Sequence, residues 1–343
     1  MPLRFDRCNG EIDLLIDQLM HKAGVHHPDM IREMIIGALK SGQENDYLAD
    51  QKLMRTTMKE MRYTNKVFSP YRNRRKVTIF GSARTPSDAP IYKTCVQFSR
   101  MLVERNYMVI TGGGPGIMRA GNEGAGAENS FAVNIHLPFE QNTNPVMDQD
   151  EKVITYKYFF NRKVAFLKEA DAVVMFPGGF GTLDETMEIL TLIQTGKNPP
   201  IPLVMIDDSD GDGYWDDWLD FLKDSLFRRG LISGDDFGLF SITRDPVEAV
   251  QIIDDFYRNY HSLRFVKNKL IIRLNKPLDS DHLHILTNEF SEILIPGGKM
   301  SLCSHLAEEN DQPDLKYLPR LAVEFNRRSY GLLKSFIRRI NSF

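Results

Sequence analysis

The sequence predicts an α/β protein built on a doubly wound parallel sheet, with a helical extension before the sheet and an α+β extension after it. Between residues 76 and 262, short apolar runs alternate with patterns that are typical of helices. Glycine clusters follow several of these runs. The pattern before residue 76 is helical, and strands and helices are mixed after residue 262. We therefore expect three parts, covering residues 1–75, 76–262 and 263–343.

The first part is expected to consist of helices. Apolar residues recur at the spacing of one helical face at Ile12, Leu15, Ile16 and Leu19. A second helix is expected to start after Pro28 and to stop at Gly42, and a third to cover about Tyr47–Val67. The basic stretch 71–76 is expected to be a solvated linker, because a nucleic-acid surface would need more basic neighbours.

The central part is expected to contain five strands, with a sixth candidate at its end. Short apolar runs place them at Val77–Phe80, Met108–Ile110, Phe131–Ile135, Ala172–Phe176, Leu203–Ile206 and Leu239–Ile242. Helices are expected between them, the first over about Asp88–Arg105 and a closing one from Pro246. Apolar strands that alternate with helices indicate a parallel sheet buried on both faces. Ligands of such sheets bind outside the carboxyl ends of the strands, so we expect the site there.

The last part is expected to assemble or regulate the protein. Strands are expected at Leu270–Leu274 and Arg320–Phe325. Two helices are marked by apolar faces, at Leu283, Leu286, Phe290 and Ile293 and at Leu332, Leu333, Phe336, Ile337 and Ile340. Basic residues gather at Arg264, Lys267, Lys269, Arg273 and Lys276 and at Arg327, Arg328, Lys334, Arg338 and Arg339. This charge could attract a phosphorylated nucleotide effector, and the apolar helix face could form a homo-oligomer, a dimer or higher. The alternative is that this helix packs on its own strands and leaves the basic residues solvated.

Composition narrows the class of protein further. The formal net charge of −3 gives no reason to expect nucleic-acid binding. Three widely separated cysteines, Cys8, Cys95 and Cys303, indicate neither a disulfide framework nor a zinc site. No apolar run reaches the roughly 18 residues of a membrane helix, and residues 1–10 lack the apolar core of a signal peptide. We expect a cytoplasmic protein without a membrane or nucleic-acid partner.

The most informative motif is Pro177-Gly-Gly-Phe-Gly-Thr-Leu-Asp-Glu185, which follows an expected strand and opens a helix to about Thr195. Its glycines permit a tight turn and a close approach of the backbone to a ligand. The free N–H groups and the positive end of the helix would suit a phosphate. In the alternative interpretation, Thr182 and Glu185 form a capping box that only satisfies the helix end. The run of glycines favours the anion site, because an ordinary cap needs none.

Two more glycine turns are expected at the same edge of the sheet. One is Thr111–Met118, with glycine at 112, 113, 114 and 116, and the other begins at Gly81-Ser82. Neither the turn at Thr111–Met118 nor the motif that begins at Pro177 has the glycine spacing of a dinucleotide-binding loop or a Walker loop. Each turn alone could be structural, but three at one edge indicate a shared ligand. Arg162 and Lys163, taken alone, would be a solvated helix face.

In combination these residues resemble the Lonely Guy (LOG) family, often labelled "lysine decarboxylase-like". The family motif PGGxGTxxE is unbroken from Pro177 to Glu185, and the family's Arg-Lys pair is matched by Arg162-Lys163. The resemblance covers about residues 76–262. It implies a Rossmann-like fold and a hydrolase, a phosphoribohydrolase that converts a nucleoside 5′-monophosphate into free base and ribose 5-phosphate. It implies no cofactor and no metal.

The resemblance also implies roles for individual residues. Arg162 and Glu185 would be the catalytic pair. The substrate and its phosphate would be bound by Gly81, Ser82, Gly113, Gly114, Lys163, Gly178, Gly179, Gly181 and Thr182. A carboxylate can stabilise the oxocarbenium-like transition state of glycosidic cleavage or activate water. The planar guanidinium of Arg162 can position ribose or phosphate.

Departures from the plant members leave the base open between AMP-type and cytokinin riboside monophosphates. Phe159-Phe160-Asn161 stands where those members usually have Met-His-Glu, and Asp184 stands where they have Glu. The alternative function is a non-catalytic nucleotide sensor on the same fold. A true lysine decarboxylase would need pyridoxal phosphate on a lysine, and only the family label suggests it. The segment 208–213 resembles the start of a calcium loop, but Leu219 stands where that loop needs Glu, so we expect an acidic turn.

Overall fold

The computed structural model describes residues 3–136, 143–208 and 213–343 of the chain. The chain falls into two compact units, Met1–Tyr63 and Thr64–Phe343. In the described residues, no helix combines the length and the apolar character needed to cross a membrane.

The first unit consists of helices. They are α1 (Glu11–Ala23), α2 (Pro28–Glu44) and the first part of α3 (Leu48–Phe68). Pro28 stands in the first turn of α2, where its missing N–H costs nothing. α1 ends before Gly24, which adopts the left-handed conformation of a helix terminus. All three helices lie where the sequence predicts them, but α2 continues past Gly42 because a single glycine is only mildly unfavourable inside a helix.

The buried face of α1 differs from the predicted one. The predicted apolar face is exposed at Ile12, Leu15 and Leu19. The core of the unit contains Leu3, Ile16, Met20 and Ile36. Asp13, on the same face as Ile16 and Met20, forms an ion pair with Arg32 of α2 that is itself buried. This polar pair fixes the side of α1 that meets α2, and apolar spacing alone could not show it.

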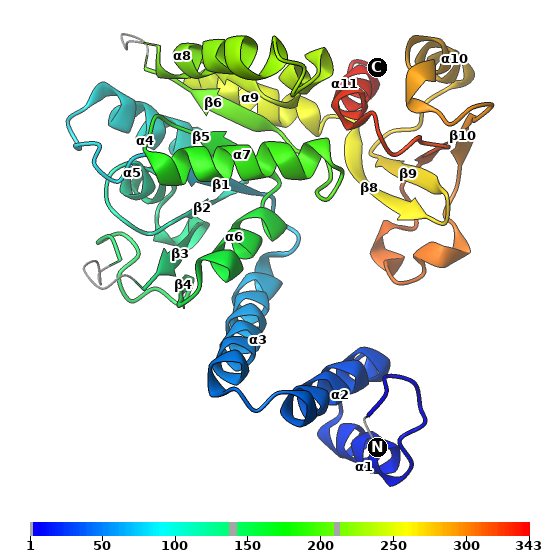
Figure 1. Ribbon diagram of the computed structural model, residues 1–343. Helices are drawn as coiled ribbons and strands as arrows, with labels where there is room; N and C mark the ends of the chain where they lie inside the picture. The colour runs from blue at the N-terminus through cyan, green and yellow to red at the C-terminus, as the bar shows by residue number, and fades with distance from the viewer. Residues whose placement is uncertain (1–2, 137–142, 209–212) are drawn as a thin grey trace. The chain divides into compact units, whose positions relative to one another are not determined.

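A sheet of seven parallel strands forms the centre of the second unit, in the order β4-β3-β2-β1-β5-β6-β7 (Figure 1). The strands are β1 (Lys76–Phe80), β2 (Met108–Thr111), β3 (Ser130–Ile135), β4 (Val153–Tyr156), β5 (Ala172–Met175), β6 (Leu203–Ile206) and β7 (Ser241–Thr243). The chain enters the sheet at β1 and adds strands outward to β4. It then returns to the other side of β1, where β5, β6 and β7 form the second half of the sheet. This is the predicted doubly wound α/β fold, and its strand order reverses between β1 and β5.

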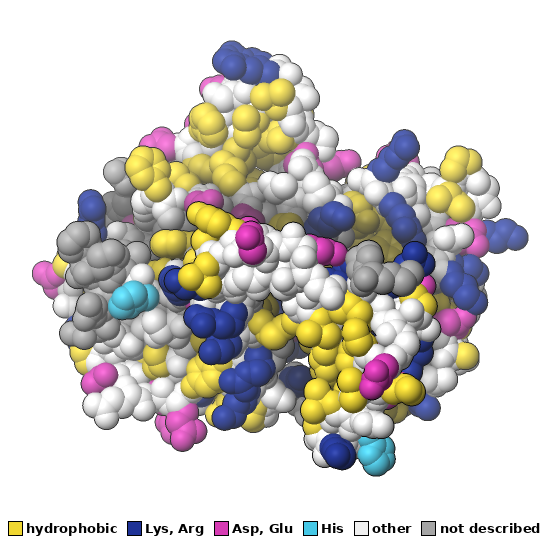
Figure 2. All heavy atoms as spheres, turned by 60° about the horizontal axis from the view of Figure 1, so that its bottom comes forward, with side chains coloured by type: hydrophobic (Ala, Val, Ile, Leu, Met, Phe, Trp, Pro, Cys, Tyr) yellow, Lys and Arg dark blue, Asp and Glu magenta, His cyan; other side chains and the backbone are white. Residues whose placement is uncertain are grey.

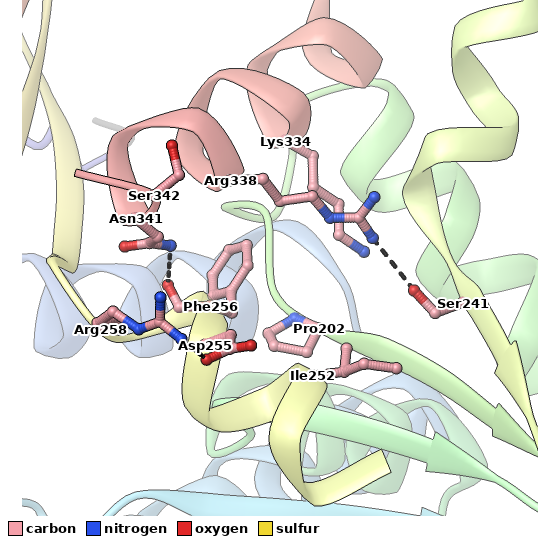
Figure 3. A pocket seen from close by; sticks show the side chains of 10 residues that line it. All are labelled: Pro202, Ser241, Ile252, Asp255, Phe256, Arg258, Lys334, Arg338, Asn341 and Ser342. Atoms are coloured by element: carbon pink, nitrogen blue, oxygen red, sulfur yellow. Dashed lines mark hydrogen bonds and ion pairs between the residues drawn. The ribbon is translucent and has the colours of Figure 1, made fainter. Parts of the chain in front are cut away.

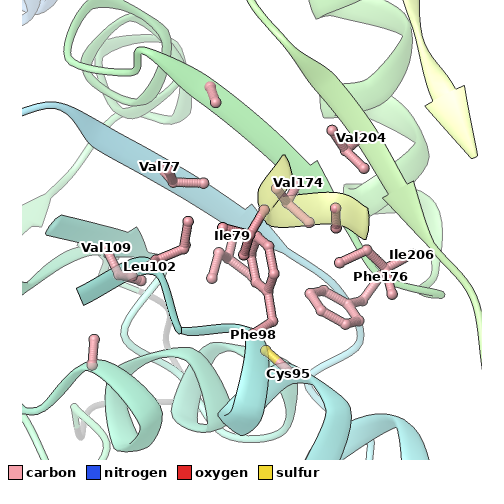
Figure 4. Packing of buried hydrophobic residues seen from close by; sticks show 14 of the residues in the cluster. Val77, Ile79, Cys95, Phe98, Leu102, Val109, Val174, Phe176, Val204 and Ile206 are labelled. Atoms are coloured by element: carbon pink, nitrogen blue, oxygen red, sulfur yellow. The ribbon is translucent and has the colours of Figure 1, made fainter. Parts of the chain in front are cut away.

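Helices cover both faces of this sheet (Figure 1). They are α4 (Pro90–Glu104), α5 (Ile117–Ala125), α6 (Phe159–Lys168), α7 (Phe180–Gln194), α8 (Tyr214–Phe221) and α9 (Pro246–Phe256). On one face, Val77, Ile79 and Val174 pack against α4, α5 and α9, as Figure 4 shows around Phe98. The intervening residues, such as Val173, face α7 and α8 on the other side. Alternate residues of each strand thus enter opposite cores, which is why the strands are apolar throughout.

The basic stretch at residues 71–76 is not the solvated linker that the sequence predicts. The guanidinium of Arg75 lies 3.5 Å from the ring centroid of Tyr257. Arg74 donates to the side chain of Asn129 at 3.1 Å, and Lys76 is buried as the first residue of β1. These side chains attach the stretch to the sheet because their long aliphatic and planar parts pack while their charges find partners.

A second sheet follows, antiparallel and in the order β10-β11-β9-β8. Its elements are β8 (Tyr260–Val266), β9 (Lys269–Leu274), α10 (Ser280–Glu289), β10 (Met300–Cys303), β11 (Arg320–Val323) and α11 (Tyr330–Asn341). The domain boundaries at 75/76 and 262/263 stay predictions, and the second position lies inside β8. The apolar face of α11 packs on this sheet, as one alternative predicts. The basic residues are not all solvated, however, because Arg273 and Lys334 are buried.

Hydrophobic side chains also reach the surface. On the face drawn in Figure 2 they form several groups between the charged side chains. Among the exposed aromatic residues of the second unit are Phe159 and Phe160, at the start of α6, and Phe180, the first residue of α7. The side chain of Phe180 is 94% exposed.

Candidate active site

The three glycine turns meet at the carboxyl edge of the sheet, after β1, β2 and β5. Ser82 joins them: its N–H donates to the carbonyl of Pro177 at 3.0 Å, and its own carbonyl accepts from the N–H of Ile117 at 3.0 Å. Gly116 permits this approach, because a Cβ there would lie 2.3 Å from the Ser82 carbonyl oxygen. Gly116 also has a φ of +63°, which side chains rarely adopt. The structure therefore brings the three predicted turns into direct contact.

The turn after β2 is held by a buried polar network that the sequence analysis missed. The hydroxyl of Thr111 donates to Asn122 at 2.7 Å and accepts from the N–H of Gly113 at 3.0 Å. Asn144 donates its side-chain amide to Asn122 at 2.9 Å and its backbone N–H to the carbonyl of Gly113 at 2.8 Å. The network fixes both sides of the turn. No local pattern could indicate that Asn144, which lies far along the chain, would be one of its members.

The third turn leaves the start of α7 open. The helix begins at Phe180, and its N-cap, Gly179, makes no side-chain hydrogen bond. The capping-box alternative is therefore wrong, because Thr182 lies inside the helix. A Cβ at Gly179 or Gly181 would meet no atom within 4 Å. Open space thus adjoins the positive end of the helix, as a bound anion would require.

Other contacts hold this third turn in place. Thr182 is buried, and a Cβ at Gly178 would lie 2.1 Å from its hydroxyl oxygen, so only glycine fits there. Tyr214 of α8 donates its hydroxyl to the carbonyl of Gly178 at 2.7 Å. The first turn is packed equally closely, since a Cβ at Gly81 would lie 2.6 Å from the side chain of Ile117.

Arg162 lies against the turn after β2. Its Nε donates to the carbonyl of Val133 at 2.8 Å, and its guanidinium carbon is 5.1 Å from the ring centroid of Phe166. A Cβ at Gly112 would lie 2.5 Å from one of its terminal nitrogens. Burial lowers the pKa of Arg162, and the nearby carboxylate of Glu185 opposes that shift. Arginine nonetheless stays charged in proteins, so the structure places a fixed cation beside this glycine turn.

Lys163, the next residue, lies among carboxylates of α7. Its Nζ is 2.7 Å from Asp184, 2.7 Å from Glu188 and 3.3 Å from Glu185. Burial works against its charge, but the carboxylates outweigh that effect and raise the pKa of Lys163. Neither member of the Arg-Lys pair is therefore the solvated side chain of the alternative interpretation.

Glu185 has an unusual environment for a carboxylate. Its side chain is 15% exposed, and it borders a small cavity lined by Phe80, Phe166 and Val173. Burial raises the pKa of Glu185 to about 7, and Lys163 lowers it only in part, because two other carboxylates lie closer to that lysine. A buried carboxyl group with a pKa near neutral, in the helix that the glycine motif opens, is a candidate for acid–base or electrostatic work.

Glu188 is a further residue that the sequence analysis missed. It stands three positions after Glu185 and four after Asp184, so all three carboxylates share one side of α7. That spacing could have indicated an acidic face. Among the described residues, no group of three or more His, Cys, Asp or Glu side chains is arranged to hold a metal ion. Most of the calcium-like segment, residues 209–212, lies outside the described residues.

The fold and this edge define the class of the protein: a Rossmann-like, doubly wound α/β protein with glycine turns where the strand order reverses. Residues 115–253 match the family model described as "Possible lysine decarboxylase". The chain is 24% identical over 185 residues to the cytokinin riboside 5′-monophosphate phosphoribohydrolase LOG2 of Arabidopsis thaliana, covering 53% of this chain and 84% of the relative. It is 28% identical over 192 residues to the phosphoribohydrolase LOG of Oryza sativa subsp. japonica, covering 54% and 75%.

Over this central part the chain is therefore similar to proteins of the LOG family, the family that its sequence motifs resemble. A solved structure that is similar in part is the molybdenum cofactor binding protein of Rippkaea orientalis. It is 20% identical, with a TM-score of 0.36, over 52% of this chain and 93% of that one.

Proposed function

We propose that this protein hydrolyses the N-glycosidic bond of a nucleoside 5′-monophosphate and releases free base and ribose 5-phosphate. The observation that carries the proposal is Glu185, a carboxyl group with a pKa of about 7 that stands one turn into the helix opened by the glycine motif. Arg162 adds a charged group at the adjoining turn. The relatives from A. thaliana and O. sativa are named for the same class of reaction.

The substrate phosphate would bind at the start of α7. Gly179 and Gly181 leave open space there, and backbone amide groups at the start of the helix would donate to phosphate oxygens. The turns at Gly81-Ser82 and Gly113-Gly114 would line the rest of the pocket. Ser82 is hydrogen-bonded both to the turn before α7 and to the turn after β2, which keeps the three turns together. With the phosphate anchored, the ribose would lie between the first turn of α7 and Arg162.

In the reaction, the bond between C1′ and the base nitrogen breaks and leaves positive charge on the sugar ring. The ionised carboxylate of Glu185 would stabilise this charge or take a proton from the attacking water. The water oxygen then bonds to C1′, and a proton goes to the departing base. Arg162 would position the ribose or the phosphate through its planar fork. We infer that Lys163 acts through Glu185, as a positioning residue, because its ammonium group is engaged by carboxylates.

The test is incubation of the purified full chain with a panel of AMP, GMP, CMP, UMP and isopentenyladenosine 5′-monophosphate. Chromatography would measure free base and ribose 5-phosphate. The proposal expects equal amounts of the two products from at least one substrate, and the ranking of substrates would identify the preferred base. Binding of a monophosphate without release of base from any of them would instead favour a nucleotide sensor.

A further inference from the structure

A second, larger cavity lies at the other edge of the main sheet (Figure 3). It has a volume of about 380 Å³ and is partly open to solvent. Pro202 precedes β6 and Ser241 begins β7, so the cavity adjoins the amino ends of these strands, whereas the glycine turns follow the carboxyl ends. The end of α9 and the last turns of α11 form its other walls. The cavity is therefore separate from the candidate active site.

Two cations on α11 enter this cavity without a carboxylate partner. Lys334 is 2% exposed, and its Nζ donates to the backbone carbonyl of Leu239 at 2.6 Å. Arg338, one turn later, donates to the hydroxyl of Ser241 at 3.1 Å. Across the ranges that the structure describes, neither side chain forms an ion pair. Figure 3 shows both side chains reaching from α11 toward the side of the cavity where Ser241 lies.

The other charged residues of the lining do not compensate these cations. Asp255 and Arg258 form an ion pair with each other, so their charges cancel. The positive charge of the cavity therefore comes from Arg338 and from the protonated form of Lys334. Burial, reinforced by the charge of Arg338, lowers the pKa of Lys334 well below its ordinary value. Charging the buried amine of Lys334 without a counter-charge is costly, and an anion in the cavity would offset that cost and favour the protonated form.

We propose that this cavity is a binding site for a small organic phosphate. Its phosphate group would lie between Lys334 and Arg338 and accept charge-assisted hydrogen bonds from both. The opposite wall presents apolar surface from Pro202, Ile252 and Phe256, which suits a ring or another apolar portion of the same ligand (Figure 3). The inference does not depend on the proposed function, because no residue of the glycine turns lines this cavity.

Isothermal titration calorimetry of the full chain tests the site, with phenyl phosphate as the probe and inorganic phosphate for comparison. Phenyl phosphate is expected to bind more tightly, because only it carries the apolar portion. Arg338→Ala is expected to weaken one binding event by about tenfold or more, the usual effect of losing a charge-assisted hydrogen bond. Lys334→Met, which keeps the length of the side chain and removes its charge, is expected to weaken the same event.

The matched control is Arg339→Ala. Arg339 is the neighbour of Arg338 on α11, but its guanidinium pairs with Glu289, and it does not line the cavity. This variant is expected to bind phenyl phosphate as the wild type does. Unchanged affinity in Arg338→Ala, which alters an exposed residue and should fold normally, would overturn the proposal even if Lys334→Met were unstable. Equal affinity for inorganic phosphate and phenyl phosphate would show that the apolar wall does not bind the apolar portion of the ligand.

Discussion

At the scale of single residues, Glu185 combines two properties that seldom occur together. It is largely removed from water, yet its neighbours include two further carboxylates, Asp184 and Glu188. Lys163 is shared among all three and therefore neutralises Glu185 only in part. Burying a carboxyl group in such surroundings lowers the stability of the folded protein, and this is common in active sites.

The substitution Glu185→Gln is expected to lower kcat by about a hundredfold or more, the scale of one group that acts in the transition state. The matched control is Asp184→Asn, which changes the neighbouring carboxylate, 61% exposed at its side chain, and should cost much less. Steady-state kinetics on the best monophosphate measures both. A fully active Glu185→Gln enzyme would exclude Glu185 from the reaction.

The same substitution is expected to leave the fold intact and to stabilise it at alkaline pH. Burial raises the pKa of Glu185 from its ordinary value of 4.5 to about 7, so the folded state favours the protonated form. Its contribution to stability is therefore present at low pH and is lost as the pH rises through 7. Thermal unfolding at pH 8 should show a higher midpoint for Glu185→Gln than for the wild type, and a much lower midpoint would contradict the assignment of the raised pKa.

The pH dependence of kcat/KM reports the same carboxyl group in the free enzyme. If the ionised form of Glu185 acts, kcat/KM should rise with pH and level off, with its half-maximal value near pH 7. The rising limb should disappear from the residual activity of Glu185→Gln. A profile that instead falls through pH 7 would assign the protonated form to the reaction, contrary to the role proposed here.

At the scale of elements, the glycine turns place the charged groups. Gly112 has no left-handed backbone, so alanine is conformationally acceptable there. Its Cβ would, however, lie 2.5 Å from the guanidinium of Arg162 and 2.5 Å from the sulfur of Met118. Both neighbours are the ends of flexible side chains, which can move. Gly112→Ala should therefore displace Arg162 without unfolding the domain.

We expect Gly112→Ala to lower kcat/KM by about tenfold or more, because small displacements of a positioning group are costly in catalysis, while the unfolding midpoint changes little. Gly42→Ala, in a helix of the first unit and with nothing near its Cβ, is the matched control and should retain full activity. Unchanged kcat/KM in Gly112→Ala would show that the guanidinium position beside this turn does not matter.

The elements also show which parts of the fold a single sequence can predict. The inner strands, such as β1, β5 and β6, are buried on both faces and appear as continuous apolar runs. The strands that were missed, β4, β8 and β10, all lie at the edge of a sheet. Their burial is interrupted, as in β4, where Thr155 is exposed between buried neighbours. An edge strand pairs with only one neighbouring strand, so it is less completely buried and its apolar pattern is weaker.

The candidate site was predictable to a similar degree. The three turns could be assigned to one edge because the carboxyl ends of parallel strands share that edge. Their direct contact through Ser82 could not be predicted from the sequence, because it depends on how closely the backbones of neighbouring turns approach each other at Gly116. The capping-box alternative fails for a local reason: the helix begins two residues before Thr182. The partners of Lys163 and the network around Asn144 depend on tertiary packing.

At the scale of the whole molecule, the extension after the main sheet has a core with a charged centre. Glu309 is fully buried and receives hydrogen bonds from Arg273 at 2.6 Å and Arg320 at 2.7 Å. Removing this carboxylate would leave two buried guanidinium groups without their counter-charge. Glu309→Ala should therefore lower the free energy of unfolding by about 3 kcal/mol or more, which thermal or chemical unfolding can measure.

The adjacent residue supplies the control for this prediction. Glu308 pairs with Lys267, whose side chain is 77% exposed, and both charges remain in contact with water. Glu308→Ala should leave the unfolding midpoint close to that of the wild type, since exposed ion pairs contribute little. Equal destabilisation by the two substitutions would mean that burial of the Glu309 cluster does not determine the stability of this extension.

The most direct measurement of the proposed function compares a nucleoside 5′-monophosphate with the matching nucleoside. The start of α7 is proposed to anchor the phosphate, and Glu185 to act on the sugar, so the phosphate should contribute binding energy to the transition state. We expect kcat/KM for the preferred monophosphate to exceed that for its nucleoside by at least about a hundredfold, the effect of losing several charge-assisted hydrogen bonds. Equal values for the two substrates would contradict phosphate anchoring at the glycine turn and, with it, the proposed arrangement of the site.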